Sequence, residues 1–168
     1  MGSEFRYFDI ETEGLDDAQH RVTFANLNGR RISLRDMDEK MLLTEIARWL
    51  HEDHHWPVIG KNLIWDLTFI AKRGKKIGVF FNMLWWLNNC KHLDLKHVAI
   101  LLNGNFRGYN RWIDRKDKPD SAMAPEWFKE GKIDMIDKYS EEERQDATRF
   151  IEWLRTSFSK IRLEDRPY

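Results

Sequence analysis

The sequence contains a single cysteine, no long hydrophobic run and no excess of charge of either sign. Cys90 on its own excludes an internal disulfide and a cysteine-rich zinc site. The single cysteine fits a reducing compartment, or simply a chain that does not use thiols, and we expect a cytoplasmic protein. No apolar run approaches the roughly 18 residues that span a bilayer, and no signal peptide is visible, so we expect no membrane partner.

The charges balance over a length that suits one folded domain. Lysine and arginine total 28, as do aspartate and glutamate, so any nucleic-acid binding must come from an uneven distribution of charge. Hydrophobic residues make up 42% of the 168 residues, which is typical of a globular core rather than of a disordered chain. No repeat or linker divides the sequence, and we expect a single domain over residues 5–168. Residues 1–4 resemble a cloning remnant, to which we assign no function.

The most informative stretch lies near the start, where two acids are separated by one residue. Aromatic and β-branched residues from Tyr7 to Thr12 predict a short strand. Because side chains alternate along a strand, Asp9 and Glu11 should share one face while Ile10 points into a core. Two carboxylates on one face repel each other unless a cation lies between them, and Mg²⁺ or Mn²⁺ takes such oxygen ligands. The alternative is a strand end that carries two solvated acids.

The rest of the chain alternates predicted strands and helices. Two strands, over 21–27 and 30–35, flank Asn28-Gly29, a strong hairpin signal, and would form an antiparallel meander with the first strand. Helical periodicity predicts a helix over 38–53 before a buried strand over 57–60, which is parallel to the first strand if the helix is a crossover. Later elements are a helix over 64–72, a short strand over 92–95 and a helix over 96–102.

Signals for helix ends complete this outline. Gly74 is a plausible C-cap for the helix before it, and Pro125 opens a further helix at its first turn. Ser140 is expected to be the N-cap of the last helix. The apolar and aromatic residues 79–87 fit either a strand or a helix. Residues 103–120 have no apolar period and predict a long surface segment.

Three separate stretches contain the residue types of one catalytic pattern: Asp9-Ile10-Glu11, then Gly60-Lys61-Asn62 with Asp66, and finally Tyr139 to Ala147. Together they resemble the three motifs of the DEDD 3′–5′ exonuclease superfamily, over about residues 6–154. The Leu93-Asp94-Leu95 segment is similar to the branch near the B-family DNA polymerase exonucleases. The resemblance implies an α/β fold of ribonuclease H-like type, with a central mixed sheet flanked by helices.

The resemblance also implies a role for each motif residue. Asp9, Glu11 and Asp66 would be ligands of two divalent ions, Mg²⁺ or Mn²⁺, and Asn62 would hold the turn or the substrate backbone. By this resemblance the protein would be a metal-dependent exonuclease that hydrolyses phosphodiester bonds from single-stranded 3′ ends, with DNA favoured over RNA. A third alternative is an exonuclease domain that acts only together with a polymerase or helicase partner.

The third motif fits the family in two registers. In one, Tyr139 orients the attacking water and Glu143 replaces the family's aspartate as fourth ligand. In the other, Asp146 is the fourth ligand. One helical face could present all three, because they are spaced i, i+4, i+7. A structural alternative makes Glu143 a capping-box acid beside Ser140. The irregular motif also suggests an alternative function, a catalytically weak or inactive nucleic-acid-binding module that retains the exonuclease fold.

Two positively charged stretches are candidates for nucleic-acid binding. The first follows the helix of the second motif and could grip phosphates or be a solvated helix end; its residues are Lys72, Arg73 and Lys75. The second mixes cations with an aromatic ring, as single-strand binders do, or is an ordinary charged loop; its residues are Arg107, Arg111 and Trp112.

The pattern His-Glu-x-x-His at residues 51–55 also occurs in zinc proteases. That pattern needs both histidines on an intact helix and a third ligand. Pro57 pushes the residue before it out of helical geometry, and no third ligand follows at a familiar spacing. A solvated helix end is therefore the favoured interpretation.

Overall fold

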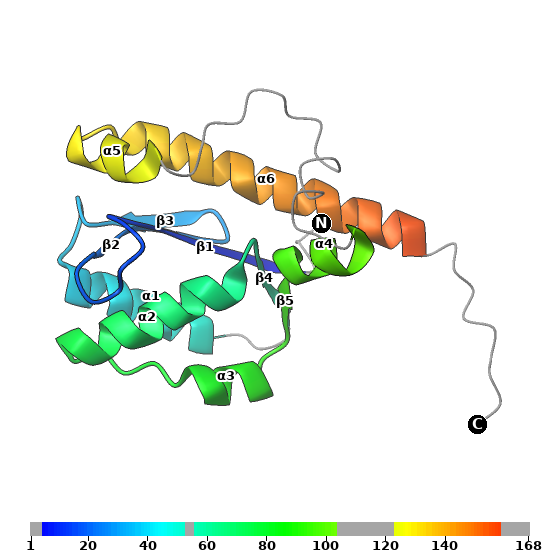
Figure 1. The fold of residues 1–168 in the computed structure, drawn as a ribbon, viewed down its shortest axis with the longest axis horizontal. Helices are drawn as coiled ribbons and strands as arrows, with labels where there is room; N and C mark the ends of the chain where they lie inside the picture. Colours follow the sequence, from blue (N-terminus) through cyan, green and yellow to red (C-terminus); the bar gives the residue numbers. More distant parts are fainter. Residues whose placement is uncertain (1–4, 53–55, 104–122, 159–168) are drawn as a thin grey trace.

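The sheet is built around the strand that carries the two acids. The computed structural model describes residues 5–52, 56–103 and 123–158. Within these residues the chain forms one five-stranded mixed sheet and six helices (Figure 1). The strand order is β3-β2-β1-β4-β5, so β1 lies at the centre. The predicted α/β class and mixed sheet are therefore confirmed.

Tight turns and one helical crossover explain this strand order. β1 (Arg6–Thr12), β2 (Val22–Leu27) and β3 (Arg30–Ser33) form the predicted antiparallel meander. Asn28 and Gly29 join β2 to β3 with φ angles of 58° and 92°, which these residue types tolerate. The chain then crosses through α1 (Glu39–His51). As a result, β4 (Val58–Gly60) pairs parallel with β1, and β5 (His92–Asp94) pairs parallel with β4.

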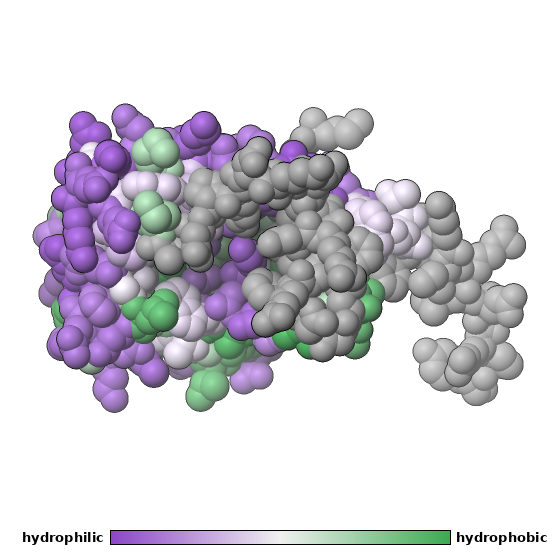
Figure 2. Space-filling view, turned by 45° about the horizontal axis from the view of Figure 1, so that its top comes forward, coloured by the Kyte–Doolittle hydropathy of each residue, from purple (hydrophilic) through white to green (hydrophobic). Residues whose placement is uncertain are grey.

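Helices cover both faces of the sheet (Figure 1). On one face lie α1 and α2 (Leu63–Ile77), followed by α3 (Met83–Asn89). On the other face lie α5 (Ala124–Lys129) and the long α6 (Ile133–Phe158), while α4 (Leu95–Asn103) follows β5. None of the helices in the described part of the chain is long and apolar enough to cross a membrane. In the view of Figure 2, hydrophilic side chains dominate the described surface, and hydrophobic residues there form separate small patches.

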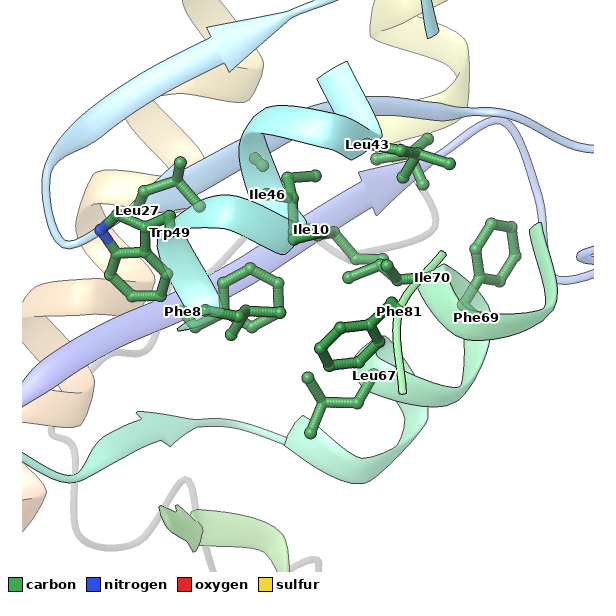
Figure 3. Packing of buried hydrophobic residues seen from close by; sticks show 14 of the residues in the cluster. Phe8, Ile10, Leu27, Leu43, Ile46, Trp49, Leu67, Phe69, Ile70 and Phe81 are labelled. Carbon is green, nitrogen blue, oxygen red and sulfur yellow. The ribbon is translucent and has the colours of Figure 1, made fainter. Parts of the chain in front are cut away.

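β1 separates two hydrophobic clusters because its side chains alternate between the faces of the sheet. Phe8 and Ile10 pack against residues of α1 and α2 (Figure 3). Tyr7 packs on the opposite side, in a cluster with Phe150 of α6. Burial of a large side chain such as Phe8, which is fully covered, contributes about 1.5–3 kcal/mol. The expected orientation of Ile10 into the core is confirmed, and the odd-numbered residues of β1 lie on the side of α6.

The C-terminal end of α2 differs from the prediction. The helix continues past Gly74, and Gly78, with a φ angle of 78°, is the C-cap. A Cβ at Gly74 would lie 2.7 Å from the carbonyl oxygen of Val79, so this glycine permits a close approach of the returning chain. The predicted C-cap at Gly74 is therefore wrong. In the sequence alone, a glycine needed for close packing cannot be distinguished from a glycine needed for a positive φ angle.

The last helix begins earlier than predicted. α6 starts at Ile133, so Ser140 lies buried inside the helix and is not its N-cap. The Nδ2 of Asn26 on β2 donates to Ser140 Oγ at 3.1 Å, which shows why a polar residue is tolerated there. The capping-box interpretation of Glu143 is therefore wrong, since Glu143 also lies well inside the helix.

The undecided segment 79–87 contains extended residues followed by the start of α3. Adjacent residues on this helix have different surroundings. Trp86 is fully buried and its Nε1 donates to the carbonyl oxygen of Leu50 at 2.9 Å, whereas Trp85 is 44% exposed. Consecutive helical residues point in different directions, so only one of the two tryptophans can enter the core.

Candidate active site

Side chains of the three motifs, carried by β1, α2 and α6, meet in one cavity beside β1. The cavity has a volume of about 550 Å³. Its lining includes Asp9 and Glu11 from β1, Asp66 from α2, and Tyr139 and Glu143 from α6. Residues that are far apart in the sequence, and that the three motifs singled out, therefore lie around one space.

The two acids of β1 are partly exposed, unlike Ile10 between them. Ser140 Oγ donates to Asp9 Oδ2 at 3.4 Å, and the same hydroxyl accepts the hydrogen bond from Asn26. Because Asn26 occupies the acceptor side of the hydroxyl, Ser140 is oriented as a donor toward the acid. Sequence reasoning missed this contact, since it placed Ser140 at a helix end.

The backbone conformation of the turn between β4 and α2 explains its Gly-x-Asn sequence. A Cβ at Gly60 would lie 2.6 Å from the carbonyl oxygen of Phe8, so glycine lets the turn pass close to β1. Asn62 has a φ angle of 65°, a left-handed conformation that asparagine tolerates better than most residues. The turn leads directly into α2, whose first turn carries Asp66. Lys61 and Asn62 both line the cavity.

Asp94 holds this turn in place from the end of β5. Its Oδ1 accepts the N–H of Asn62 at 3.1 Å and of Lys96 at 2.9 Å, and its Oδ2 accepts the N–H of Ile64 at 3.1 Å. One buried carboxylate therefore satisfies N–H groups at the starts of both α2 and α4. Sequence reasoning did not select Asp94 as a site residue, although an aspartate just before a helical pattern is a recognisable capping signal.

Asp66, one of the four acids that line the cavity, is 3% exposed. Its Oδ2 accepts no hydrogen bond from any residue that the structure describes. Burial raises the pKa of Asp66 well above its ordinary value, and the charges of Asp9, Glu11 and Asp94 raise it further, while Lys61 lowers it. The cavity is therefore a place where negative charge is costly and a bound cation would be stabilising.

The third motif contributes Tyr139 and Glu143 rather than Asp146. The hydroxyl of Tyr139 donates to Glu143 Oε1 at 2.8 Å, and Lys61 Nζ lies 3.4 Å from the same oxygen. Burial, together with the nearby carboxylates, raises the pKa of Tyr139 above its ordinary value. Asp146 is fully buried, is not among the residues that line the cavity, and pairs with Arg149 of its own helix. The geometry thus favours Glu143 over Asp146 as the fourth acid.

The basic run at the end of the second motif's helix makes contacts within the protein. Arg73 is 8% exposed and donates two hydrogen bonds of 2.8 Å to the carboxylate of Glu39. Lys72 Nζ lies 3.1 Å from Asp17 Oδ2, and Lys75 is exposed. Arg73 therefore ties α2 to α1, and none of the three cations lines the cavity.

Two further sequence-based candidates fall partly or wholly outside the described residues. Arg107, Arg111 and Trp112 lie outside them, as do the last three residues of the His-Glu-x-x-His pattern. α1 ends at His51 and Glu52 is its C-cap, so the described part of this pattern is an exposed helix end.

The carboxylates of the cavity are suitable ligands for a divalent ion, but their oxygens do not surround a single point in this structure. Among residues 5–52, 56–103 and 123–158, no three acidic, histidine or cysteine side chains are close enough to hold a metal ion together. Carboxylate oxygens are nevertheless the donors that Mg²⁺ and Mn²⁺ prefer, and Asp66 offers a buried oxygen with no described hydrogen bond. Asp9 and Glu11 are partly exposed, so a change of side-chain rotamer would alter the distances between their oxygens without moving the backbone.

The sequence matches no protein-family model, and no curated protein is significantly similar to it. Function must therefore be argued from the chemistry of the cavity itself.

Proposed function

We propose that the protein is a metal-dependent 3′–5′ exonuclease that acts on single-stranded ends, with DNA favoured over RNA. One observation carries the proposal. Four acids and a tyrosine, contributed by β1, α2 and α6 in the order of the three sequence motifs, line one cavity. Neighbouring carboxylates repel one another in a protein that holds no cation, so a bound cation gives a physical reason for placing these acids around one cavity.

We also propose the ribonuclease H-like fold as the finer description of the sheet. An antiparallel meander, β1-β2-β3, is extended on the other side of β1 by the parallel strands β4 and β5. The acids of the first motif stand on the central strand. Both features support the assignment that the motifs suggested.

The acids of the cavity fit the requirement for divalent ions. Two ions, Mg²⁺ or Mn²⁺, would supply an activated water and stabilise the leaving oxyanion. Asp9, Glu11, Asp66 and Glu143 would hold them, since four carboxylates balance the four positive charges. Asp66 gains from a cation, because burial has removed it from water and its Oδ2 accepts no hydrogen bond from any described residue.

Tyr139 has a hydroxyl that can orient the attacking water. With its pKa raised, this hydroxyl stays protonated at neutral pH, and its proton is donated to Glu143 Oε1. Tyr139 would therefore position a water through its hydroxyl oxygen, as an acceptor, and cannot take the water's proton as a phenolate. In the reaction the water oxygen bonds to phosphorus while the bond from phosphorus to the 3′ oxygen breaks. Each cycle then releases a 5′-mononucleotide and leaves a new 3′ hydroxyl on the strand.

Two side chains on the cavity wall are suited to the substrate backbone. Lys96 Nζ donates to Asn62 Oδ1 at 3.0 Å, so the Asn62 amide group is oriented by a cation. The amide nitrogen and the ammonium group are both donors, and both would contact phosphate oxygens of a bound strand.

The test is degradation of a 5′-labelled single strand with Mg²⁺ or Mn²⁺. We expect a ladder that shortens from the 3′ end, and no ladder when that end is blocked. Asp9→Asn should abolish the ladder, whereas Asp134→Asn, at an exposed position of α6 outside the cavity, should not. Parallel DNA and RNA strands determine the preferred sugar. Undiminished cleavage by Asp9→Asn would refute the proposal.

A second candidate is a nucleic-acid-binding module without catalysis. It is favoured by the contact between Lys61 and Glu143, which places a fixed positive charge against the fourth acid. A cavity partly neutralised by lysine could bind a strand without divalent ions. Strand binding with no cleavage under any divalent ion would support this function over the exonuclease.

A further inference from the structure

Lys61 is the cation that lies closest to the fourth acid in the described part of the chain. Its Nζ is 3.4 Å from Glu143 Oε1, and the two side chains are 22% and 4% exposed. Lys61 stands in the turn after β4, whereas Glu143 stands on α6, so the contact links the second motif to the third. The ammonium group thus occupies part of the space around an acid that the proposed function assigns to a divalent ion.

The second partner of Glu143 restricts where this carboxylate can go. Tyr139 donates to the same oxygen that Lys61 contacts. Two positive or donor groups on Oε1 hold the carboxylate in one orientation, while no three acids of the described residues are gathered as a ready ligand set. An incoming ion must therefore compete with an ammonium group for Glu143, since the two cations repel each other at such short range.

We infer that Lys61 competes with the divalent ion for Glu143 and thereby weakens metal binding by the protein in the absence of substrate. The inference rests on the proposed function, because it assigns Glu143 to the ion. It makes Lys61 a positioning residue that sets metal affinity. The lysine leaves Glu143 when the ion binds, and its charge remains in the cavity that would hold the substrate phosphate.

The experiment is calorimetric titration of the full chain with Mn²⁺ alone, without nucleic acid. Lys61→Met removes the competing charge and should tighten Mn²⁺ binding by about tenfold or more. Lys61→Arg keeps the charge and should bind as weakly as the wild type. If Lys61→Met does not fold, as judged by circular dichroism, Lys61→Gln gives the same comparison.

Lys96→Met is the matched control, because Lys96 lines the same cavity but donates to the Asn62 amide oxygen. It removes an equal charge from the cavity and should change the affinity by less than about threefold. A double-mutant cycle then isolates the contact: in a Glu143→Gln background, Lys61→Met should have no effect beyond about threefold.

The outcomes separate the inference from the proposed function. Equal tightening by Lys61→Met and Lys96→Met, or tightening that persists with Glu143→Gln, would show a general effect of charge and overturn the inference. If Lys61→Met binds Mn²⁺ no more tightly than the wild type, and the wild type degrades a labelled strand, the inference is overturned and the proposed function is not. No Mn²⁺ binding by any variant, together with no cleavage, would overturn the proposed function as well.

Discussion

Replacing Asp66 by asparagine should stabilise the metal-free protein at pH 8. The substitution keeps the shape of the side chain and removes an ionisable group that is buried beside Asp9 and Glu11. A buried group without a hydrogen bond costs more when it is charged than when it is neutral, and penalties of this kind are about 1–3 kcal/mol, so we expect a gain of that order. For a chain of this length the gain corresponds to a rise in Tm of roughly 2–4 °C for each kcal/mol.

The direction of the pH dependence follows from the raised pKa of Asp66. The folded state holds the proton of this carboxyl more tightly than the unfolded state does. Stability is therefore lost as the pH rises from the ordinary pKa of an aspartate toward the raised value in the folded protein. Asp66→Asn removes this loss, so its advantage over the wild type should be larger at pH 8 than at pH 5.

The assay is chemical unfolding with EDTA present, at both pH values. Asp94→Asn is the control, because Asp94 is also buried but accepts three backbone hydrogen bonds, and its substitution should destabilise the protein. Adding Mn²⁺ at about 100 times its Kd should stabilise the wild type by about 2.7 kcal/mol and Asp66→Asn by less. An Asp66→Asn variant less stable than the wild type at pH 8 would refute the reasoning.

Three further outcomes test other parts of the account. Gly74→Ala should destabilise the protein by about 1–3 kcal/mol in urea unfolding, because the added Cβ would contact the backbone of Val79. Gly78→Ala should cost about 1–2 kcal/mol, because its Cβ has open space around it but the residue has a positive φ angle. If Gly74→Ala leaves the stability unchanged, the close packing at Gly74 is contradicted. Arg73→Ala should destabilise the protein by about 3 kcal/mol and leave its affinity for a labelled single strand unchanged in a binding titration. A loss of affinity with unchanged stability would instead show that Arg73 binds nucleic acid. Glu143→Gln should lower kcat by about 10²-fold or more, whereas Asp146→Asn should lower Tm and largely retain kcat; the reverse result would make Asp146 the fourth ligand.

The part of the fold that sequence predicted best depends on local, periodic signals. The alternation along β1 placed Ile10 in the core, and Asn28-Gly29 marked the hairpin between β2 and β3. Both signals depend on neighbouring residues only: the alternation on the pleat of one strand, and the turn on the φ angles of two residues.

The parts that sequence did not predict depend on contacts between distant elements. Ser140 has the identity of an N-cap, yet it lies inside α6, where Asn26 of β2 satisfies its hydroxyl. Asp94 holds the turn of the second motif through backbone contacts that no spacing in the chain reveals. Likewise, the i, i+4, i+7 spacing put Asp146 on the same helical face as Tyr139 and left open which acid would reach the cavity.

The basic run shows the same distinction for charge. A cluster of cations near a motif predicts a phosphate site only if its side chains face the substrate. Arg73 faces Glu39 of α1 instead, which sequence could not indicate because the two residues belong to different helices.

The most direct test of the central claim is the anomalous scattering of Mn²⁺ in crystals of the wild-type protein soaked with that ion. We expect Mn²⁺ peaks within coordination distance of Asp9, Glu11, Asp66 and Glu143, whose side chains would move toward the ions. An empty cavity at millimolar Mn²⁺, or ions bound only elsewhere on the protein, would contradict the claim.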